Sequence, residues 1–271
     1  MVNIRPIPGF SDNYIWMLQQ EGSSQAVVVD PGDGSRLIPL LESESIDLVA
    51  VLITHQHIDH VGAVASLTEL YPGLTVYGPK QSVVSNHRFG PERPITELIT
   101  QPLVEGDQFD IEPLGMSFKV MTVPGHTLDH IAYYGQGMLF CGDTLFGCGC
   151  GRIMGGNKQL FEASLTKIAD LPADTQLYCA HEYTLDNIGF AKWVEPDNPD
   201  LLQRDEEAMA KQEKGIPTVP ASLELELKTN PFLRYKIPAV RLAAENYMGE
   251  KLATDADVFA AIREWKDREY D

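Results

Sequence analysis

The first two thirds of the chain alternate short apolar runs with turns that contain glycine or proline. Seven runs rich in Val, Ile, Leu, Tyr and Phe are predicted to be strands: residues 26–30, 48–54, 74–77, 117–123, 131–134, 138–141 and 176–180. Helical spacing of apolar positions comes between them, at about residues 36–44, 62–70 and 159–170. This alternation predicts an α/β fold, in which sheet layers are covered by helices.

The pattern changes after about His181. Four later stretches have helical spacing: "LDNIGFAKWVE", "DLLQRDEEAMAKQEK", "VRLAAENYM" and "DADVFAAIREWKDREY". Thr254 or Asp255 is predicted to cap the last of these helices, and the proline-bearing stretch "GIPTVPASLELELKTNPFLRYKIP" interrupts the series. We therefore expect a first domain over residues 1–181 and a smaller, mostly helical domain over residues 182–271.

The composition is that of an ordinary globular protein, with 44% hydrophobic and 22% charged residues in 271. No uncharged apolar run is long enough to span a bilayer, and the N-terminus lacks the basic and apolar regions of a signal peptide. We therefore expect a cytoplasmic protein that does not bind membranes, and we expect it to be a monomer.

The chain is strongly acidic: it has 21 Lys and Arg residues and 39 Asp and Glu residues, which gives a net charge of −18. A surface of this sign repels phosphate backbones, so nucleic acid is excluded as a partner. An anionic substrate would need a local cluster of basic residues.

Three of the seven histidines lie within six residues, in "THQHIDH". His55, His57 and His60 follow the apolar run "DLVAVLIT", and Asp59 stands beside the last of them. The end of a strand is where α/β folds place their chemistry, and side chains at positions i and i+2 of an extended segment point the same way. Imidazole and carboxylate together suit zinc, iron or manganese, so the cluster predicts a metal site.

Three further polar residues each follow an apolar run, namely His126, Asp143 and His181. Together with the cluster they suffice for two ions with a shared carboxylate and room for a bridging water. The predicted first site is His55, His57 and His126. The predicted second site is Asp59, His60 and His181, and Asp143 is predicted to bridge the two.

The spacing T-H-x-H-x-D-H, with G-H-T, G-D-T and a last histidine downstream, resembles the metallo-β-lactamase-fold hydrolases. Within that superfamily the chain resembles the glyoxalase II (hydroxyacylglutathione hydrolase) family nearly from end to end. The more specific matching stretches are "DNYIW", "VDPGD", "THQHIDHVG", "PGHT", "CGDTLF", "CGR", "AHEYT" and "REWKD". The resemblance implies an αββα sandwich for the first domain, followed by the helical appendage.

The resemblance also implies the reaction. The substrate would be S-(2-hydroxyacyl)glutathione, chiefly S-D-lactoylglutathione, cleaved to D-lactate and glutathione by a hydroxide that bridges two divalent ions. Zinc is the first expectation for these ions, with iron or manganese as alternatives. Asp59 is expected to orient the hydroxide as well as to bind metal.

Substrate contacts follow from the same resemblance. Arg152 stands where the family has a basic residue that contacts glutathione, and Tyr183 where it has a tyrosine that contacts the substrate. Arg263 and Lys266, spaced i and i+3 on one helix face, match the R-x-x-K that binds the glycine end of glutathione. Met154 departs from the family's aromatic residue, since it can pack against a substrate but offers no phenol.

The remaining histidines and cysteines are predicted to be outside the chemistry. His130 is expected to support the ligands, and His87 to be a surface residue. Cys141, Cys148, Cys150 and Cys179 are expected to be small, buried and reduced. Two alternatives stay open: a persulfide dioxygenase of the same fold with one iron, and a non-enzymatic metal or redox module that uses Cys148 and Cys150.

Overall fold

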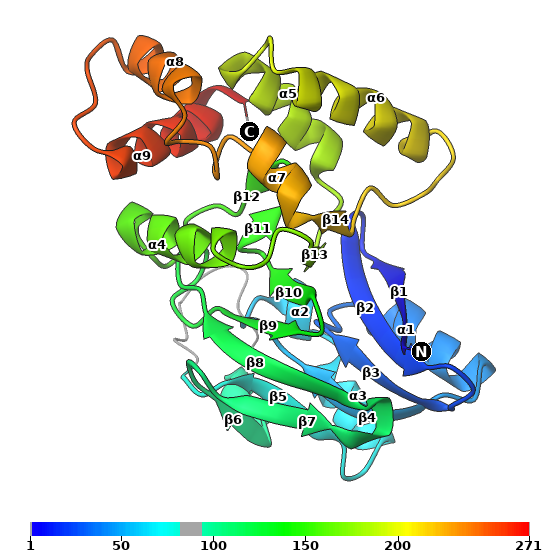
Figure 1. Cartoon of the computed structure of the whole chain (residues 1–271). Coiled ribbons are helices and arrows are strands. Elements are labelled where there is room, and N and C mark those ends of the chain that lie inside the picture. The colour runs from blue at the N-terminus through cyan, green and yellow to red at the C-terminus, as the bar shows by residue number, and fades with distance from the viewer. Residues whose placement is uncertain (1, 82–93, 271) are drawn as a thin grey trace. The chain divides into compact units, whose positions relative to one another are not determined.

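The computed structural model describes residues 2–81 and 94–270, so the predicted surface residue His87 lies outside the described residues. The chain divides into two compact units (Figure 1). The first comprises Met1–Val123 and Thr127–Gly142, and the second comprises Pro124–His126 and Asp143–Asp271. The predicted domain boundary at residue 181 falls inside the second unit, and the division at that residue stays a prediction.

The first unit contains a six-stranded sheet in the order β1-β2-β3-β4-β5-β6. Its strands are β1 Val2–Gly9, β2 Asn13–Gln20, β3 Gln25–Val29, β4 Asp47–Leu52, β5 Thr75–Pro79 and β6 Gln101–Leu103. Strands β1 to β3 pair antiparallel, whereas β3 to β6 pair parallel. Because β3 and β4 are parallel neighbours, the residues that follow them lie at the same edge of the sheet.

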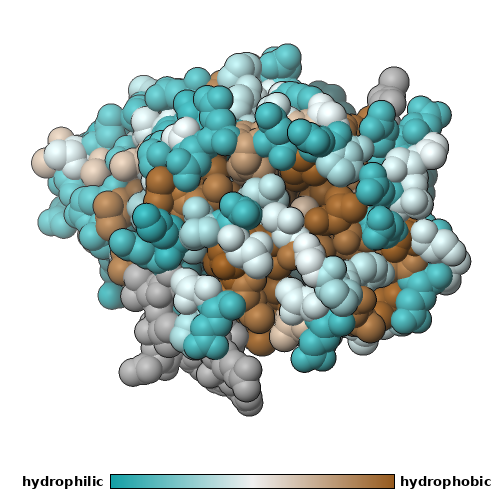
Figure 2. All heavy atoms as spheres, turned by 90° about the horizontal axis from the view of Figure 1, so that it is seen from below, coloured by the Kyte–Doolittle hydropathy of each residue, from teal (hydrophilic) through white to brown (hydrophobic). Residues whose placement is uncertain are grey.

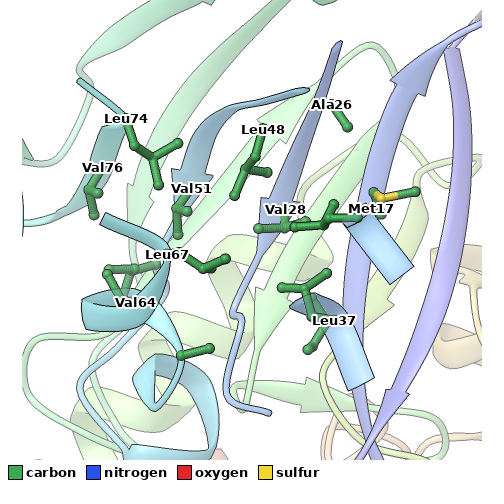
Figure 3. Packing of buried hydrophobic residues seen from close by; sticks show 14 of the residues in the cluster. Met17, Ala26, Val28, Leu37, Leu48, Val51, Val64, Leu67, Leu74 and Val76 are labelled. Carbon is green, nitrogen blue, oxygen red and sulfur yellow. The ribbon is translucent and has the colours of Figure 1, made fainter. Parts of the chain in front are cut away.

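Helices cover one face of this sheet. They are α1 Gly34–Ser43 and α3 Val64–Leu70, with the single turn α2 Ile58–Val61 between β4 and α3. Leu37 of α1 and Leu67 of α3 pack on strand residues such as Val28 and Val51, and all four are fully buried (Figure 3). This apolar layer fixes the strand ends from which the polar residues project.

The rest of the first unit is antiparallel. Its strands are β7 Gln108–Ile111, β8 Met116–Thr122, β9 Ile131–Gly135 and β10 Met138–Gly142, paired in that order. Two short 3-10 turns, η1 Ile95–Glu97 and η2 Glu112–Leu114, lie between β5 and β8 along the chain.

The second unit is mostly helical. Its helices are α4 Lys158–Ala169, α5 Thr184–Val194, α6 Pro199–Gln212, α7 Leu223–Thr229, α8 Pro238–Met248 and α9 Asp255–Trp265, with the π-helical turn η3 Lys266–Tyr270. Two strand pairs accompany them: β11 Leu145–Phe146 with β12 Gly149–Cys150, and β13 Gln176–Cys179 with β14 Ala221–Ser222.

The predicted elements are confirmed with shifted ends. The seven predicted strands correspond to β3, β4, β5, β8, β9, β10 and β13, and the helix predicted over residues 62–70 begins at Val64. Thr254 is the cap of α9, in a capping box with Asp257. The sequence patterns missed the long strands β1 and β2, the short strands β6, β7, β11, β12 and β14, and the helices α2 and α7. The strand β1 carries Pro6 and Pro8, which an edge strand tolerates because one side of its ladder is unpaired.

No described helix in residues 2–81 or 94–270 is both long enough and apolar enough to cross a bilayer. Apolar side chains do reach the surface, and one face of the molecule shows them among hydrophilic neighbours (Figure 2). Such mixing is normal for proteins in water.

The core of the first unit supplies a stability test. Replacing fully buried Leu67 by alanine leaves a cavity under the sheet and should lower the free energy of unfolding by about 2–5 kcal/mol. Leu70 lies on the same helix but is 51% exposed, so Leu70→Ala should change it by no more than about 0.5 kcal/mol. Urea denaturation of both variants measures the difference, and equal losses would contradict the described orientation of α3.

Candidate metal centre

Asp30 and Thr54 form the base of the candidate centre in the first unit. Asp30 directly follows β3, and Thr54 follows β4 by two residues, so the parallel pairing brings them together. The Asp30 carboxylate accepts hydrogen bonds from the Thr54 backbone N–H (2.8 Å) and from its hydroxyl (2.7 Å). Asp30 has a left-handed backbone (φ 52°), a strained conformation that these bonds help to hold.

The same carboxylate fixes His60. The Nδ1 of His60 lies 3.0 Å from Oδ2 of Asp30, and both residues are buried. A histidine that donates Nδ1–H to a carboxylate keeps Nε2 as an acceptor, which is the form that binds metal. Nε2 of His60 faces Oδ2 of Asp59 at 3.5 Å, and that oxygen also accepts a bond from Nδ2 of Asn13 at 3.1 Å.

Gly32 sets the position of the turn that carries Asp59 and His60. A Cβ on Gly32 would lie 1.7 Å from the backbone oxygen of Asp59, so no other residue fits there without moving α2. The backbone N–H of Ala63 also donates to the Pro31 carbonyl at 2.9 Å. The loop after β3 therefore supports the turn after β4.

His55 and His57 lie on the extended segment between β4 and α2 and are buried. Nε2 of His55 and Nδ1 of His57 are 3.0 Å apart. The predicted placement of both imidazoles on one side of an extended segment is therefore confirmed. Two ring nitrogens this close suit a shared cation, because each has a lone pair when neutral.

The second unit brings three further ligand candidates together. Asp143, directly after β10, directs one carboxylate oxygen at each of two histidines. Its Oδ2 is 3.4 Å from Nε2 of His126, and its Oδ1 is 3.3 Å from Nε2 of His181. The Nδ1 of His126 lies 2.8 Å from the backbone oxygen of Arg152, so the Arg152 carbonyl selects the tautomer that leaves Nε2 towards Asp143.

Each unit supplies residues with the composition of a metal site. The first unit contributes His55, His57, Asp59 and His60, and the second contributes His126, Asp143 and His181. All are buried except the partly exposed Asp59. The donors are imidazole nitrogens and carboxylate oxygens, a set that zinc, iron and manganese accept.

His130 lies outside both groups. Its ring stacks on His55 at 4.5 Å and its Nδ1 lies 3.1 Å from the Ile131 carbonyl oxygen, which agrees with a supporting role. Nearby Asp129, which replaces the glycine of the resembled family, is also buried. Burial raises the pKa of the Asp129 carboxyl to about 6.

The predicted substrate residues differ in exposure. Arg152 is exposed and Met154 is partly exposed. Tyr183, also partly exposed, stacks its ring on His181 at 4.7 Å and meets the Phe146 ring edge-on at 5.2 Å. Arg152 and Tyr183 are therefore near the ligand residues of their own unit.

Arg263 and Lys266 are buried, at 1% and 6% exposed. The Arg263 guanidinium donates to Oδ1 of Asp267 (2.8 and 3.1 Å) and to the Cys150 carbonyl (3.1 Å). The Lys266 ammonium lies 5.7 Å from the centre of the Tyr270 ring. Both residues thus have partners in the fold, and their contact with a substrate stays a prediction.

The cysteines are buried thiols, as predicted. Burial raises the pKa of Cys148 to about 12, of Cys150 to about 11 and of Cys179 to about 12. Because the thiolate is the reactive form, these groups are poorly suited to metal storage or redox sensing.

Two residues with roles at the centre were missed in the sequence, Asp30 and Asn13. Both stand in stretches that carry the family resemblance, "VDPGD" and "DNYIW", and both are buried and polar. Their contacts with His60 and Asp59 join positions 30 and 46 residues apart, which spacing along the chain could not indicate.

Comparison with known proteins gives full-length matches. Residues 8–181 match the family model described as metallo-beta-lactamase superfamily, and residues 182–269 match that described as hydroxyacylglutathione hydrolase C-terminus. A hydroxyacylglutathione hydrolase of Nitrosomonas europaea is 44% identical, over 98% of this chain and 96% of that protein. One of Alkalilimnicola ehrlichii is 46% identical, over 99% of this chain and all of that protein.

Solved structures share the fold. ETHE1 from Myxococcus xanthus aligns with a TM-score of 0.62 at 22% identity, covering 100% of this chain and 93% of that one. TTHA1623, solved in a di-iron-bound form, aligns with a TM-score of 0.58 at 26% identity, covering 84% of this chain and 100% of that one. The predicted fold class, a metallo-β-lactamase-type α/β fold with a helical C-terminal part, is confirmed. With relatives above 40% identity over nearly its whole length, the chain belongs to the hydroxyacylglutathione hydrolase family of the metallo-β-lactamase superfamily.

Proposed function

We propose that this protein hydrolyses the thioester of S-(2-hydroxyacyl)glutathione, chiefly S-D-lactoylglutathione, to D-lactate and glutathione. The observation that carries the proposal is the Asp143 carboxylate, which directs one oxygen at His126 and the other at His181 in the second unit. The relatives named as hydroxyacylglutathione hydrolases give the reaction and the substrate class.

The ligand residues fit two divalent ions, held as predicted by His55, His57 and His126, by Asp59, His60 and His181, and by a bridging Asp143. Such ions, when bound, lower the pKa of a water to near neutrality and polarise an acyl oxygen. We expect zinc first, with iron as the alternative that the di-iron form of TTHA1623 favours. This donor set does not discriminate strongly among zinc, iron and manganese.

The residues of the chain then orient the reactants. Asp59, whose Oδ2 accepts a bond from Asn13, can accept a hydrogen bond from the attacking water and aim its lone pair at the acyl carbon. A thiolate leaves with little acid assistance, so the reaction needs no protein acid beside the sulfur. Asp30 and the Arg152 carbonyl hold His60 and His126 as neutral ligands.

The substrate carries carboxylates, so this acidic protein must meet it with local cations. We assign this role to Arg152 and to Arg263 and Lys266 near the C-terminus. Tyr183, stacked on His181, would add a contact from its phenol. Met154 would contribute packing only. Because Arg263 already bonds Asp267 and Cys150, part of its effect would be to hold the loop that leads to Arg152.

The direct test is loss of S-D-lactoylglutathione by purified protein, with elemental analysis of the same sample. Two ions per chain and thioester hydrolysis support the proposal. A single bound iron, oxygen consumption with glutathione persulfide and no hydrolysis would support the dioxygenase alternative instead.

Removing the Asp143 carboxylate tests its proposed bridging role in the metal centre. Asp143→Asn should lose bound metal and lower kcat by more than about 100-fold, because even the outer partners of metal ligands are worth about 10- to 100-fold. Asp110→Asn is the control, since Asp110 is exposed and bonds only Ser117 among the contacts described for its side chain. An Asp143→Asn protein with two ions and normal turnover would refute the bridging assignment.

A substitution of Arg152 tests its proposed contact with the substrate. If its guanidinium binds a glutathione carboxylate, Arg152→Gln removes a charged hydrogen bond worth about 1.5–3 kcal/mol, and KM should rise about 10- to 100-fold. Lys228→Gln removes an exposed cation on α7 that pairs with Glu224 and should leave KM unchanged. Equal KM values for both variants would remove Arg152 from the substrate site.

The reactivity of the cysteine thiols tests the redox alternative. All four cysteines should resist a thiol reagent at pH 7 in the folded protein and react in guanidinium, because all four are buried and burial raises the pKa of Cys148, Cys150 and Cys179. Rapid labelling of Cys148 or Cys150 in the native protein, followed by peptide mapping, would instead favour a redox role.

A further inference from the structure

The segment from Asp143 to Arg152 joins a proposed metal ligand to a proposed substrate contact. It contains the hairpin of β11 and β12, with Gly147 and Cys148 at its turn. Its conformation therefore sets the position of both functional residues. The contacts that hold this hairpin come from the helical part of the second unit.

Side chains from three helical segments donate to successive carbonyls of the hairpin. Nδ2 of Asn187, on α5, donates to the Gly147 carbonyl at 3.0 Å. Nδ2 of Asn230, at the end of α7, lies 3.3 Å from the Phe146 oxygen and 3.0 Å from the Gly149 oxygen. With Arg263 on the Cys150 carbonyl at 3.1 Å, the hairpin backbone is bound along its length.

The turn of the hairpin is strained. Cys148 has a φ of 57°, in the left-handed region that a side chain disfavours. Its backbone N–H donates to Oε2 of Glu226 at 2.8 Å, and its Sγ lies 3.2 Å from the Thr229 carbonyl oxygen. Such a conformation persists only where neighbouring groups determine it, and here the Glu226 carboxylate is one of them.

Glu226 is 1% exposed and accepts bonds from three directions. Besides the Cys148 N–H, it accepts from Nδ2 of Asn230 at 3.0 Å and from the buried guanidinium of Arg204. Burial alone would lower the pKa of Arg204, but the neighbouring carboxylate raises it above its ordinary value. A buried pair of this kind adds little net stability, so fixing a conformation is the better account of its presence.

We propose that Glu226 is a positioning residue for the metal centre. It acts through the hairpin, which places Asp143 against His126 and His181, and through Phe146, whose ring meets those of His181 (5.7 Å) and Tyr183 (5.2 Å) edge-on. The helical part of the chain would thus shape the ligand geometry as well as contact the substrate. The inference rests on the proposed function only for the measurement of kcat.

The test is Glu226→Gln, which keeps the side chain's shape but sets an amide N–H₂ against surrounding donors. The matched control is Glu195→Gln, because Glu195 is also buried and paired to an arginine, Arg234, at 2.7 and 2.9 Å. Its side-chain bonds go to Arg234 rather than to the hairpin. The wild type and both variants are loaded with Co²⁺, and affinity, visible spectrum, kcat and melting temperature are measured.

Both variants should melt at lower temperature, since Glu226→Gln leaves buried Arg204, and Glu195→Gln leaves partly buried Arg234, without a charge partner. Only Glu226→Gln should bind Co²⁺ about tenfold or more weaker, shift the visible bands and lower kcat with S-D-lactoylglutathione by a similar factor. A spectrum, affinity and kcat equal to those of Glu195→Gln would overturn the proposal.

Two further outcomes are distinguishable. If wild-type protein fails to hydrolyse the thioester, the proposed function fails, and the Co²⁺ spectra still decide the role of Glu226. If Glu226→Gln does not fold, Glu226→Asp keeps the negative charge beside Arg204 but shortens the reach of the carboxylate towards the Cys148 N–H. Co²⁺ affinity and spectrum equal to those of Glu195→Gln in that variant would then overturn the proposal.

Discussion

Burying several imidazoles and carboxylates side by side costs free energy unless each group is bonded on the side away from its ligand position. In the first unit Asp30 meets this requirement for His60, and Asn13 does so for Asp59. In the second unit the carbonyl of Arg152 does so for His126. The geometry of the candidate centre depends on these outer bonds, because they select the tautomer and rotamer of each ligand.

The outer bonds depend in turn on the layers beneath them. Asp30 reaches His60 because β3 and β4 are parallel neighbours, and because α1 and α3 cover their buried face. Gly32 allows the loop after β3 to touch the backbone of α2, where any side chain would clash. A local substitution far from the ligands could therefore move Asp59 and His60 together.

In the second unit, buried polar side chains fix the hairpin between Asp143 and Arg152. Helices α5 to α9 supply Asn187, Arg204, Glu226 and Arg263, and three of these four bond the hairpin between Asp143 and Arg152 directly. Arg204 acts one step away, on Glu226. This arrangement connects the helices near the C-terminus to the candidate ligands Asp143, His126 and His181 in the same unit. It also explains why Arg263 is buried, since its guanidinium bonds the Cys150 carbonyl of the hairpin.

The sequence alone determined the candidate ligand residues, since His55, His57, Asp59 and His60 are crowded after one apolar run and His126, Asp143 and His181 each follow another. It also determined half of the described strands and most of the described helices, because their apolar periodicity is local. Only the tertiary structure identified Asp30, Asn13 and Glu226, whose partners lie 30, 46 and 78 residues away along the chain. Their roles arise from strand pairing and helix packing, and such long-range contacts leave no periodic signal in a single sequence.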